Sequence, residues 1–209
     1  MYPPPMNMTR ALLSTLLLLL APSTLQAQPR QEGFVWGVRA GAGGRYDDVR
    51  MCVASAAGTK GGAAVEAYLF TEVGRVGNVV ATINVPVLRP VLFAVAFKML
   101  QLEPDLSVDI HHPLSAGLDL VYGPRVGLSF HYGPDYRSES KDPGRGPSFF
   151  AVGPKLGLTL ALQFRRPGKT DYTIGINPYF IPLFAVGDPS FPDGFVVGGM
   201  LEGAMRWGG

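Results

Sequence analysis

The sequence contains little charge and almost no cysteine. Only 16% of its 209 residues are charged, against about 25% in a typical soluble domain. Its single cysteine, Cys52, excludes an intrachain disulfide scaffold. The 18 basic and 16 acidic residues leave a net charge of +2 and form no basic cluster, which argues against a nucleic-acid partner. A hydrophobic content of 47% excludes a wholly disordered chain.

Residues 1–27 have the pattern of a secretory signal. Arg10 precedes an apolar run over residues 11–21, and small and polar residues follow up to Ala27. We therefore predict export, cleavage after Ala27 and a mature domain of residues 28–209. The alternative is an N-terminal anchor that stays attached, although the apolar run is shorter than the about 20 residues of a helical span.

Bulky apolar residues alternate with small or polar ones along most of the mature chain. In residues 150–164, even positions carry residues such as Leu156, Leu158 and Leu160, and odd positions carry Gly, Ala, Thr, Lys and Gln. A strand places alternating residues on opposite faces, whereas a helix would scatter them. The pattern predicts eight strands, at residues 33–43, 62–73, 78–85, 105–111, 118–132, 150–164, 172–184 and 195–207.

The second face of these strands combines Gly and Ala with single charges of both signs. An eight-stranded barrel has an interior just wide enough to be filled by side chains, and charges enclosed there must pair because water is scarce. The bulky face then meets lipid, as in outer-membrane barrels. We predict an all-β fold, a closed antiparallel up-and-down transmembrane β-barrel of eight strands. The charges predicted to line its interior are Arg39, Glu66, Glu72, Asp119, Arg125, Lys155, Glu202 and Arg206.

The predicted connections alternate in length. Long connections cover residues 44–61, 86–104, 133–147 and 187–194, and short ones cover residues 74–77, 112–113 and 166–169. Outer-membrane barrels have short periplasmic turns and longer extracellular loops. This alternation places the mature N-terminus in the periplasm and Cys52 in the first outer loop. Segment 86–104 is too apolar for an ordinary loop, and we predict either a short helix at the outer rim or an additional pair of strands.

Aromatic residues gather at both ends of the predicted strands, as in the belts at the two membrane interfaces. The inner belt would hold Phe34, Trp36, Phe164, Tyr172 and Trp207, and the outer belt Phe130, Tyr132, Phe149, Phe150, Phe184 and Phe195. Four prolines fall inside strands, where they cannot donate to the ladder. We expect bulges, or strand portions beyond the bilayer, at Pro124, Pro154, Pro178 and Pro182.

Four segments resemble those of a known family. They are the first strand, Phe34-Val35-Trp36-Gly37-Val38-Arg39-Ala40-Gly41, two Gly-Pro-x-x-Gly-Leu segments that begin at Gly123 and Gly153, and an amphipathic last strand. Together with the signal sequence, they resemble small bacterial outer-membrane β-barrel proteins, in particular the transmembrane domain of OmpA and OmpX-like barrels. The resemblance covers most of residues 33–207 and implies a barrel in the outer membrane.

One pair of residues suggests a catalytic site. Ser129 and His131 share the inward face of a strand, and Glu202 or Asp119 could orient the histidine. Barrel enzymes that modify lipid A use such constellations, but a deacylase of this architecture would show the order His-x-Ser, which is the reverse of the order here. A nucleophile also needs a base within hydrogen-bond reach, and two positions along one strand face fit this loosely.

The sequence carries no metal-ligand pattern. Its histidines, His111, His112 and His131, show neither an HxxxH spacing nor a pairing with cysteine. We therefore predict that the protein has no metal, no cofactor and no enzymatic activity. Cys52 is predicted to be a free thiol or to pair with another chain.

We predict a monomeric outer-membrane barrel with a plugged lumen and a structural or surface-binding role through its outer loops. Its partners would be outer-membrane lipid and an extracellular molecule that the sequence does not identify. A first alternative is a lipid-modifying enzyme, or a conduit that uses segment 86–104 as an apolar gate. A second alternative is a soluble, exported, lipocalin-like barrel, in which the bulky faces would point inward and the charged faces outward.

Overall fold

The computed structural model describes residues 34–48, 61–95, 100–134, 148–166, 168, 170–187 and 193–208. The predicted signal segment 1–27, Cys52 and connections 49–60 and 135–147 lie outside the described residues. The same holds for the side chains of Phe93, Val95, Pro134, Ser148 and Phe149.

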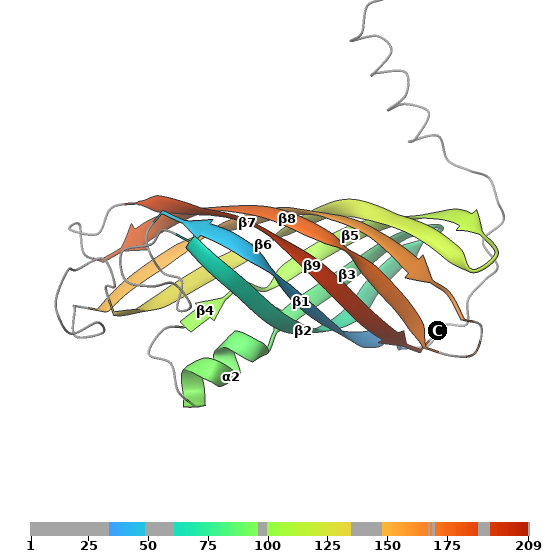
Figure 1. Cartoon of the computed structure of the whole chain (residues 1–209), viewed down its shortest axis with the longest axis horizontal. Coiled ribbons are helices and arrows are strands. Elements are labelled where there is room, and N and C mark those ends of the chain that lie inside the picture. The colour runs from blue at the N-terminus through green and yellow to red at the C-terminus, as the bar shows by residue number, and fades with distance from the viewer. Residues whose placement is uncertain are drawn as a thin grey trace, which may run out of the picture.

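Antiparallel strands make up most of the described chain, and one short helix accompanies them (Figure 1). The elements are β1 Trp36–Asp47, β2 Gly61–Val76, β3 Val79–Pro86, α2 Leu88–Val95, β4 Leu100–Leu102, β5 Asp105–Ser115, β6 Leu118–Pro134, β7 Ser148–Phe164, β8 Asp171–Val186 and β9 Gly194–Trp207. Among the residues that the structure describes, no helix has the length and apolarity needed for a helical membrane crossing.

Eight of the strands close into a ring. Hydrogen-bonded neighbours follow the order β1-β2-β3-β5-β6-β7-β8-β9, and β9 pairs with β1 (Figure 1). All these pairings are antiparallel. The closed antiparallel barrel of eight strands confirms the prediction made from period-two alternation.

The ninth strand, β4, is an extension of β5. Leu100 of β4 pairs with Tyr132 of β6, and Asp105 of β5 pairs with Gly127 of β6 in the same register. Only two residues interrupt the strand, and one of them, Pro104, still accepts a hydrogen bond from the Leu128 amide at 3.1 Å. The helix expected in segment 86–104 is therefore present as α2. The expected additional pair of strands is wrong, because β4 only prolongs a strand of the ring.

The bulky apolar row points away from the barrel. Leu156, Leu158 and Leu160 of β7 are 50%, 57% and 48% exposed, whereas Lys155 and Thr159, on the opposite face, are buried. The same alternation follows β6, β8 and β9. The soluble lipocalin-like alternative is therefore wrong, because it required the bulky residues inside.

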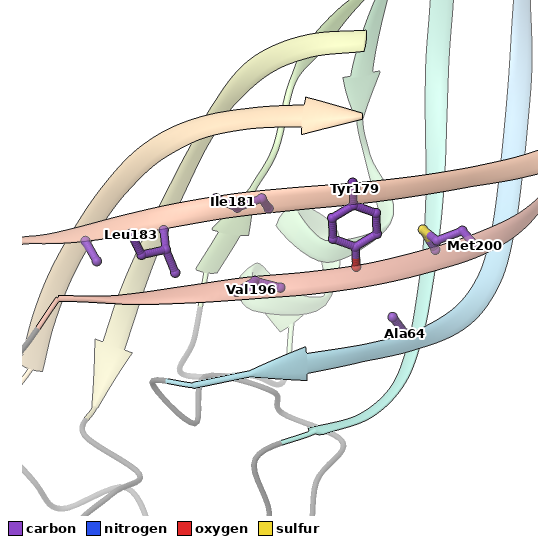
Figure 2. Close-up of a cluster of buried hydrophobic side chains, with 7 residues drawn as sticks. Ala64, Tyr179, Ile181, Leu183, Val196 and Met200 are labelled. Atoms are coloured by element: carbon purple, nitrogen blue, oxygen red, sulfur yellow. The ribbon is translucent and has the colours of Figure 1, made fainter. Parts of the chain in front are cut away.

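One part of the interior is apolar, which the sequence reading did not predict. Most of the side chains labelled in Figure 2 are buried on the inward faces of β8 and β9, alternating with exposed residues such as Phe180 and Val197, and Ala64 comes from β2. With Ala151 of β7, which the figure does not label, they form one buried cluster: Ala64, Tyr179, Ile181, Leu183, Val196 and Met200. Packed side chains thus fill part of the barrel, as its narrow width requires.

The strand prolines interrupt pairing without shifting register. Pro154 lies opposite Pro182 in a gap of the β7–β8 ladder, yet the register is the same on both sides of the gap. Pro124 lies at a similar gap between β5 and β6. Each proline keeps its partner on the other side, Leu128 for Pro154 and Leu158 for Pro124. The bulges expected at Pro124, Pro154, Pro178 and Pro182 are wrong, because a missing N–H removes a hydrogen bond without adding a residue.

Glycine precedes proline in the repeated Gly-Pro segments for a steric reason. A Cβ at Gly123 would collide with the Val108 carbonyl, and a Cβ at Gly153 would collide with the Pro182 carbonyl. The neighbouring backbone therefore lies where a side chain would begin. This explains why glycine occupies the position before proline in both copies of the repeat.

Register shifts occur at two other places, between Glu72 and Gly74 and between Pro113 and Ser115. Because Pro113 stays paired with Asp119 and the extra residue is Leu114, β5 continues past the turn predicted at residues 112–113, and the turn lies at residues 116–117. The β2–β3 turn lies at residues 77–78, where Gly77 has a φ of 58°. The long and short connections alternate as predicted, which gives the barrel a short-turn end and a long-connection end.

Exposed aromatic residues lie near both ends. Trp36 and Trp207 pair across β1 and β9 at the short-turn end, with ring centroids 4.8 Å apart. Phe180 and Phe195 lie toward the long-connection end, with centroids 6.0 Å apart. The remaining described members of the predicted belts also lie near strand ends and are half-buried or exposed: Phe34, Phe130, Tyr132, Phe150, Phe164, Tyr172 and Phe184.

Candidate functional site

The charged interior is the candidate site, because it holds most of the polar chemistry of the described chain. Period two places inward residues at every second position of each strand. Of the eight predicted interior charges, Glu66, Asp119, Arg125, Lys155, Glu202 and Arg206 are buried, and Arg39 and Glu72 are half-buried. The contacts divide them into three groups along the barrel.

The central group joins strands that are not neighbours. The Arg125 guanidinium of β6 donates two hydrogen bonds to the Glu202 carboxylate of β9, from NH1 to Oε1 at 3.0 Å and from NH2 to Oε2 at 2.8 Å. Its Nε donates to the Thr159 hydroxyl at 3.1 Å. Arg39 of β1 lies 3.7 Å from Glu202. The two-point geometry of Arg125 and Glu202 is the strongest form of an ion pair.

The second group surrounds Glu103, at the interruption between β4 and β5. One of its oxygens, Oε1, lies 3.2 Å from Arg45 NH1, 3.2 Å from Arg89 NH1 and 3.4 Å from His131 Nε2. Lys155 Nζ is 4.0 Å from the other oxygen and 3.0 Å from Asp105 Oδ2. One carboxylate is thus shared by groups from β1, α2, β6 and β7.

The cations of this group have further partners. Arg45 also reaches Asp47 Oδ2 at 3.3 Å, and Arg89 Nε reaches Glu66 Oε2 at 3.1 Å. Lys155 Nζ also lies 5.5 Å from the ring centroid of Tyr68 and 5.6 Å from that of Tyr179, within the range of cation–π attraction.

The third group lies at the short-turn end. Arg206 contacts Glu72, and Arg75 reaches the same carboxylate at 3.1 Å. Asp119 pairs with Arg165 at 2.9 Å. Among the predicted charges, Arg206 contacts Glu72, and Arg125 and Arg39 contact Glu202. Glu66, Asp119 and Lys155 pair instead with residues that the sequence reading did not select.

The pair Ser129 and His131 does not form the constellation expected of a nucleophile and its base. Both side chains are fully buried, but the Ser129 hydroxyl has no hydrogen-bond partner among the described residues. His131 lies beside Glu103 rather than beside Glu202 or Asp119. Asp119 is twelve positions away on the same strand, which corresponds to about 40 Å at a rise of about 3.3 Å per residue.

The sequence reading missed Arg45, Arg89, Glu103 and Asp105. Arg89 lies in helix α2, where a period-two pattern assigns no face. Glu103 was assigned to a connection, although the alternation of β5 continues back through Glu103 and Gln101. Arg45 was assigned to a loop, although β1 continues to Asp47 and keeps its alternation there. Extending each period-two pattern to the last alternating residue would have found Arg45 and its neighbour Asp47.

The described residues offer no arrangement for a metal. No group of three or more His, Cys, Asp or Glu side chains in the described ranges is placed to hold an ion. The carboxylates near one another in the interior are paired with arginine or lysine instead. The arrangement can therefore hold the strands together electrostatically.

Comparisons with known proteins bear on the fold. No protein-family model and no curated protein matches the sequence. Among solved structures, the chain is similar to neisserial surface protein A (NspA), with a TM-score of 0.53 and 12% identity over 83% of this chain and 95% of that chain. Ail, the attachment invasion locus protein of Yersinia pestis, matches with a TM-score of 0.36 and 14% identity over 83% of this chain and 98% of that chain. The fold is that of a small outer-membrane β-barrel.

The similarity to NspA adds an independent observation to the ring of hydrogen bonds. An eight-stranded barrel of this type agrees with the resemblance to OmpA and OmpX-like barrels that the sequence pattern suggested. At this level of identity the comparison establishes architecture alone. The role of the protein must be argued from its own surfaces.

Proposed function

We propose that this protein is exported, inserts into the bacterial outer membrane as a sealed barrel and binds a partner at the cell surface through its long connections. The main support for this proposal is the exposed apolar wall of the barrel. Residues such as Leu128, Leu158, Ile176 and Leu201 point outward from four successive strands of a closed ring. Soluble monomers rarely expose contiguous apolar patches larger than a few hundred Å², whereas lipid solvates such a wall.

Cell fractionation tests the location. We expect the mature chain in the outer-membrane pellet, released only by detergent and beginning at Gln28 in its mass spectrum. Release by osmotic shock without detergent would overturn the proposal. A membrane-impermeant maleimide then tests the orientation: Cys52 should be labelled in intact cells, and a Cys52→Ser variant should not. Labelling only after lysis would place the long connections in the periplasm.

The proposed seal rests on the interior side chains. Arg125 and Lys155 are at most 2% exposed, and Ile181 and Val196 are fully buried. Charged pairs and an apolar cluster together occupy the interior, which supports a lumen without a continuous water path. In planar lipid bilayers we expect no conductance steps from the purified barrel, with a porin in the same membrane as positive control. Reproducible open-channel steps would contradict the sealed lumen.

We also propose that the barrel is not an enzyme. The unpartnered Ser129 hydroxyl and the contact of His131 with Glu103 argue against an aligned nucleophile and base. The conduit alternative, in which segment 86–104 is an apolar gate, has little support. Arg89, Glu66 and Glu103 form a charged group where this segment meets the interior. Mass spectrometry of lipid A and phospholipids should be identical in cells that carry the native chain and Ser129→Ala. A difference would restore the enzymatic alternative.

A further inference from the structure

Helix α2 has its polar and apolar sides reversed relative to a helix on a water-soluble protein. Its sequence, LRPVLFAV, contains one charged residue, Arg89. The Arg89 side chain is only 12% exposed and turns toward the interior, where Nε lies 3.1 Å from Glu66 Oε2 and NH1 lies 3.2 Å from Glu103 Oε1. A surface helix in water would instead bury its apolar residues and expose its charge.

The outward side of α2 is consequently apolar. Val91 is 57% exposed, and Ala94 is also exposed. The helix lies to the side of the barrel rather than along its axis, and it packs against β2 and β4 (Figure 1). Exposed Val65 and Leu69 of β2 and Val85 of β3 belong to the wall near which α2 lies. The helix therefore adds to the apolar surface of the wall.

The attachment of α2 is short and polar. The strand before it ends at Pro86, and the amide of Val87 still donates to the Ala67 carbonyl of β2 at 2.8 Å. Two residues later, the Arg89 amide donates to Glu66 Oε1 at 3.4 Å. A carboxylate near the first turn of a helix is favourable, because the free N–H groups there carry partial positive charge. Glu66 thus binds both the backbone and the side chain of Arg89.

We propose that α2 is an interfacial helix whose outward face binds the acyl chains of lipid in the leaflet nearest the long connections. Arg89 ties the helix to the barrel from inside, so that no charge remains on the side that meets lipid. An apolar face on a helix that lies parallel to a membrane surface is stabilised by burial at the headgroup–acyl boundary. This inference rests on the proposed membrane location of the barrel.

Fluorescence quenching tests the inference separately from the barrel. Single-cysteine variants Val91→Cys, Leu158→Cys and Ala116→Cys are prepared in a Cys52→Ser background, labelled with bimane and reconstituted in phospholipid nanodiscs, which leave both faces open to solutes. Lipids with brominated acyl chains quench from the membrane, and iodide quenches from water. Leu158 is the control for the barrel wall, and Ala116, in the short turn after β5, is the control for water.

We expect brominated lipid to quench the label at Val91 by at least half as much as the label at Leu158, and iodide to quench it several-fold less than the label at Ala116. If Leu158 is quenched by lipid while Val91 is quenched by iodide, the helix lies in water and the inference fails, although the barrel remains in the membrane. If lipid quenches neither label, the proposed function fails as well. Protection of Val91 from both quenchers would mean that a second copy or another protein segment covers α2, which also overturns the inference.

Discussion

Arg125 and Glu202 form a two-point ion pair across the barrel interior, although their strands, β6 and β9, are not neighbours in the ring. The backbone ladders connect only adjacent strands. A pair between distant strands therefore fixes the cross-section of the barrel in a way that the ladders alone do not. Arg39 of β1, 3.7 Å from the same carboxylate, connects a third strand to this pair.

Replacing one member of the pair should destabilise the barrel. Arg125→Met leaves the buried Glu202 carboxylate with Arg39 alone, and breaking a buried pair typically costs about 3–5 kcal/mol. We expect a loss near the lower end of that range, measured by urea unfolding in lipid vesicles. The double variant Arg125→Met/Glu202→Met should show a coupling of at least about 1 kcal/mol, as residues in one network do. Additive losses would contradict a direct pair.

A charge on the outward wall should be costly only where lipid surrounds it. Leu158→Arg is expected to lower the free energy of unfolding in vesicles by about 2–4 kcal/mol, the cost of arginine near the bilayer midplane. The matched control is Val76→Arg, at an even more exposed position beside the β2–β3 turn, where about 0.5 kcal/mol or less is expected. Equal tolerance of the two substitutions would refute the assignment of the wall to lipid.

The Asn177 side chain should replace the backbone hydrogen bond that Pro178 cannot donate. Its Nδ2 donates to the Leu158 carbonyl at 2.8 Å, on the side where Pro178 has no N–H to offer. Asn177→Leu should therefore cost about 1–3 kcal/mol, the penalty for an unpaired buried carbonyl. Pro178→Val, which restores the missing amide, should recover most of that loss in the double variant. Urea unfolding of the four proteins measures the effect, and no recovery would contradict it.

Glu66 and Arg89 should be coupled in stability. Arg89→Met removes the partner of Glu66, whereas Glu103 keeps Arg45 and Lys155. We expect a loss of about 3 kcal/mol in the native background, because a buried carboxylate loses its cation. In a Glu66→Gln background the same substitution should cost at least about 1 kcal/mol less. An equal cost in both backgrounds would show that Arg89 acts through Glu103 instead.

Period two was sufficient to predict the strands and their faces. Leu156, Leu158 and Leu160 alternate with small or polar residues, and only one face of a closed wall can accommodate the bulky set. Turn positions were less predictable. Pro113 reads as a turn residue in the sequence, but it lies within β5 and pairs with Asp119.

Partners across the interior could not be predicted, because they depend on how far each strand is displaced along the ring. The sequence identifies Glu66 and Lys155 as inward charges but not the arginine or aspartate that each one meets. Glu103 was missed for a different reason. It was assigned to a connection, although the alternation of β5 continues back through Glu103 to Gln101, and both side chains are buried.

The facing prolines Pro154 and Pro182 make the cylinder mechanically uneven. The β6–β7 ladder runs without a gap from Leu118 and Phe164 to Pro134 and Ser148, whereas the β7–β8 ladder is broken at two places. Pulling β8 away from β7 therefore breaks fewer hydrogen bonds per unit length than pulling β6 away from β7. Strain on β7 will therefore open its seam with β8 before its seam with β6.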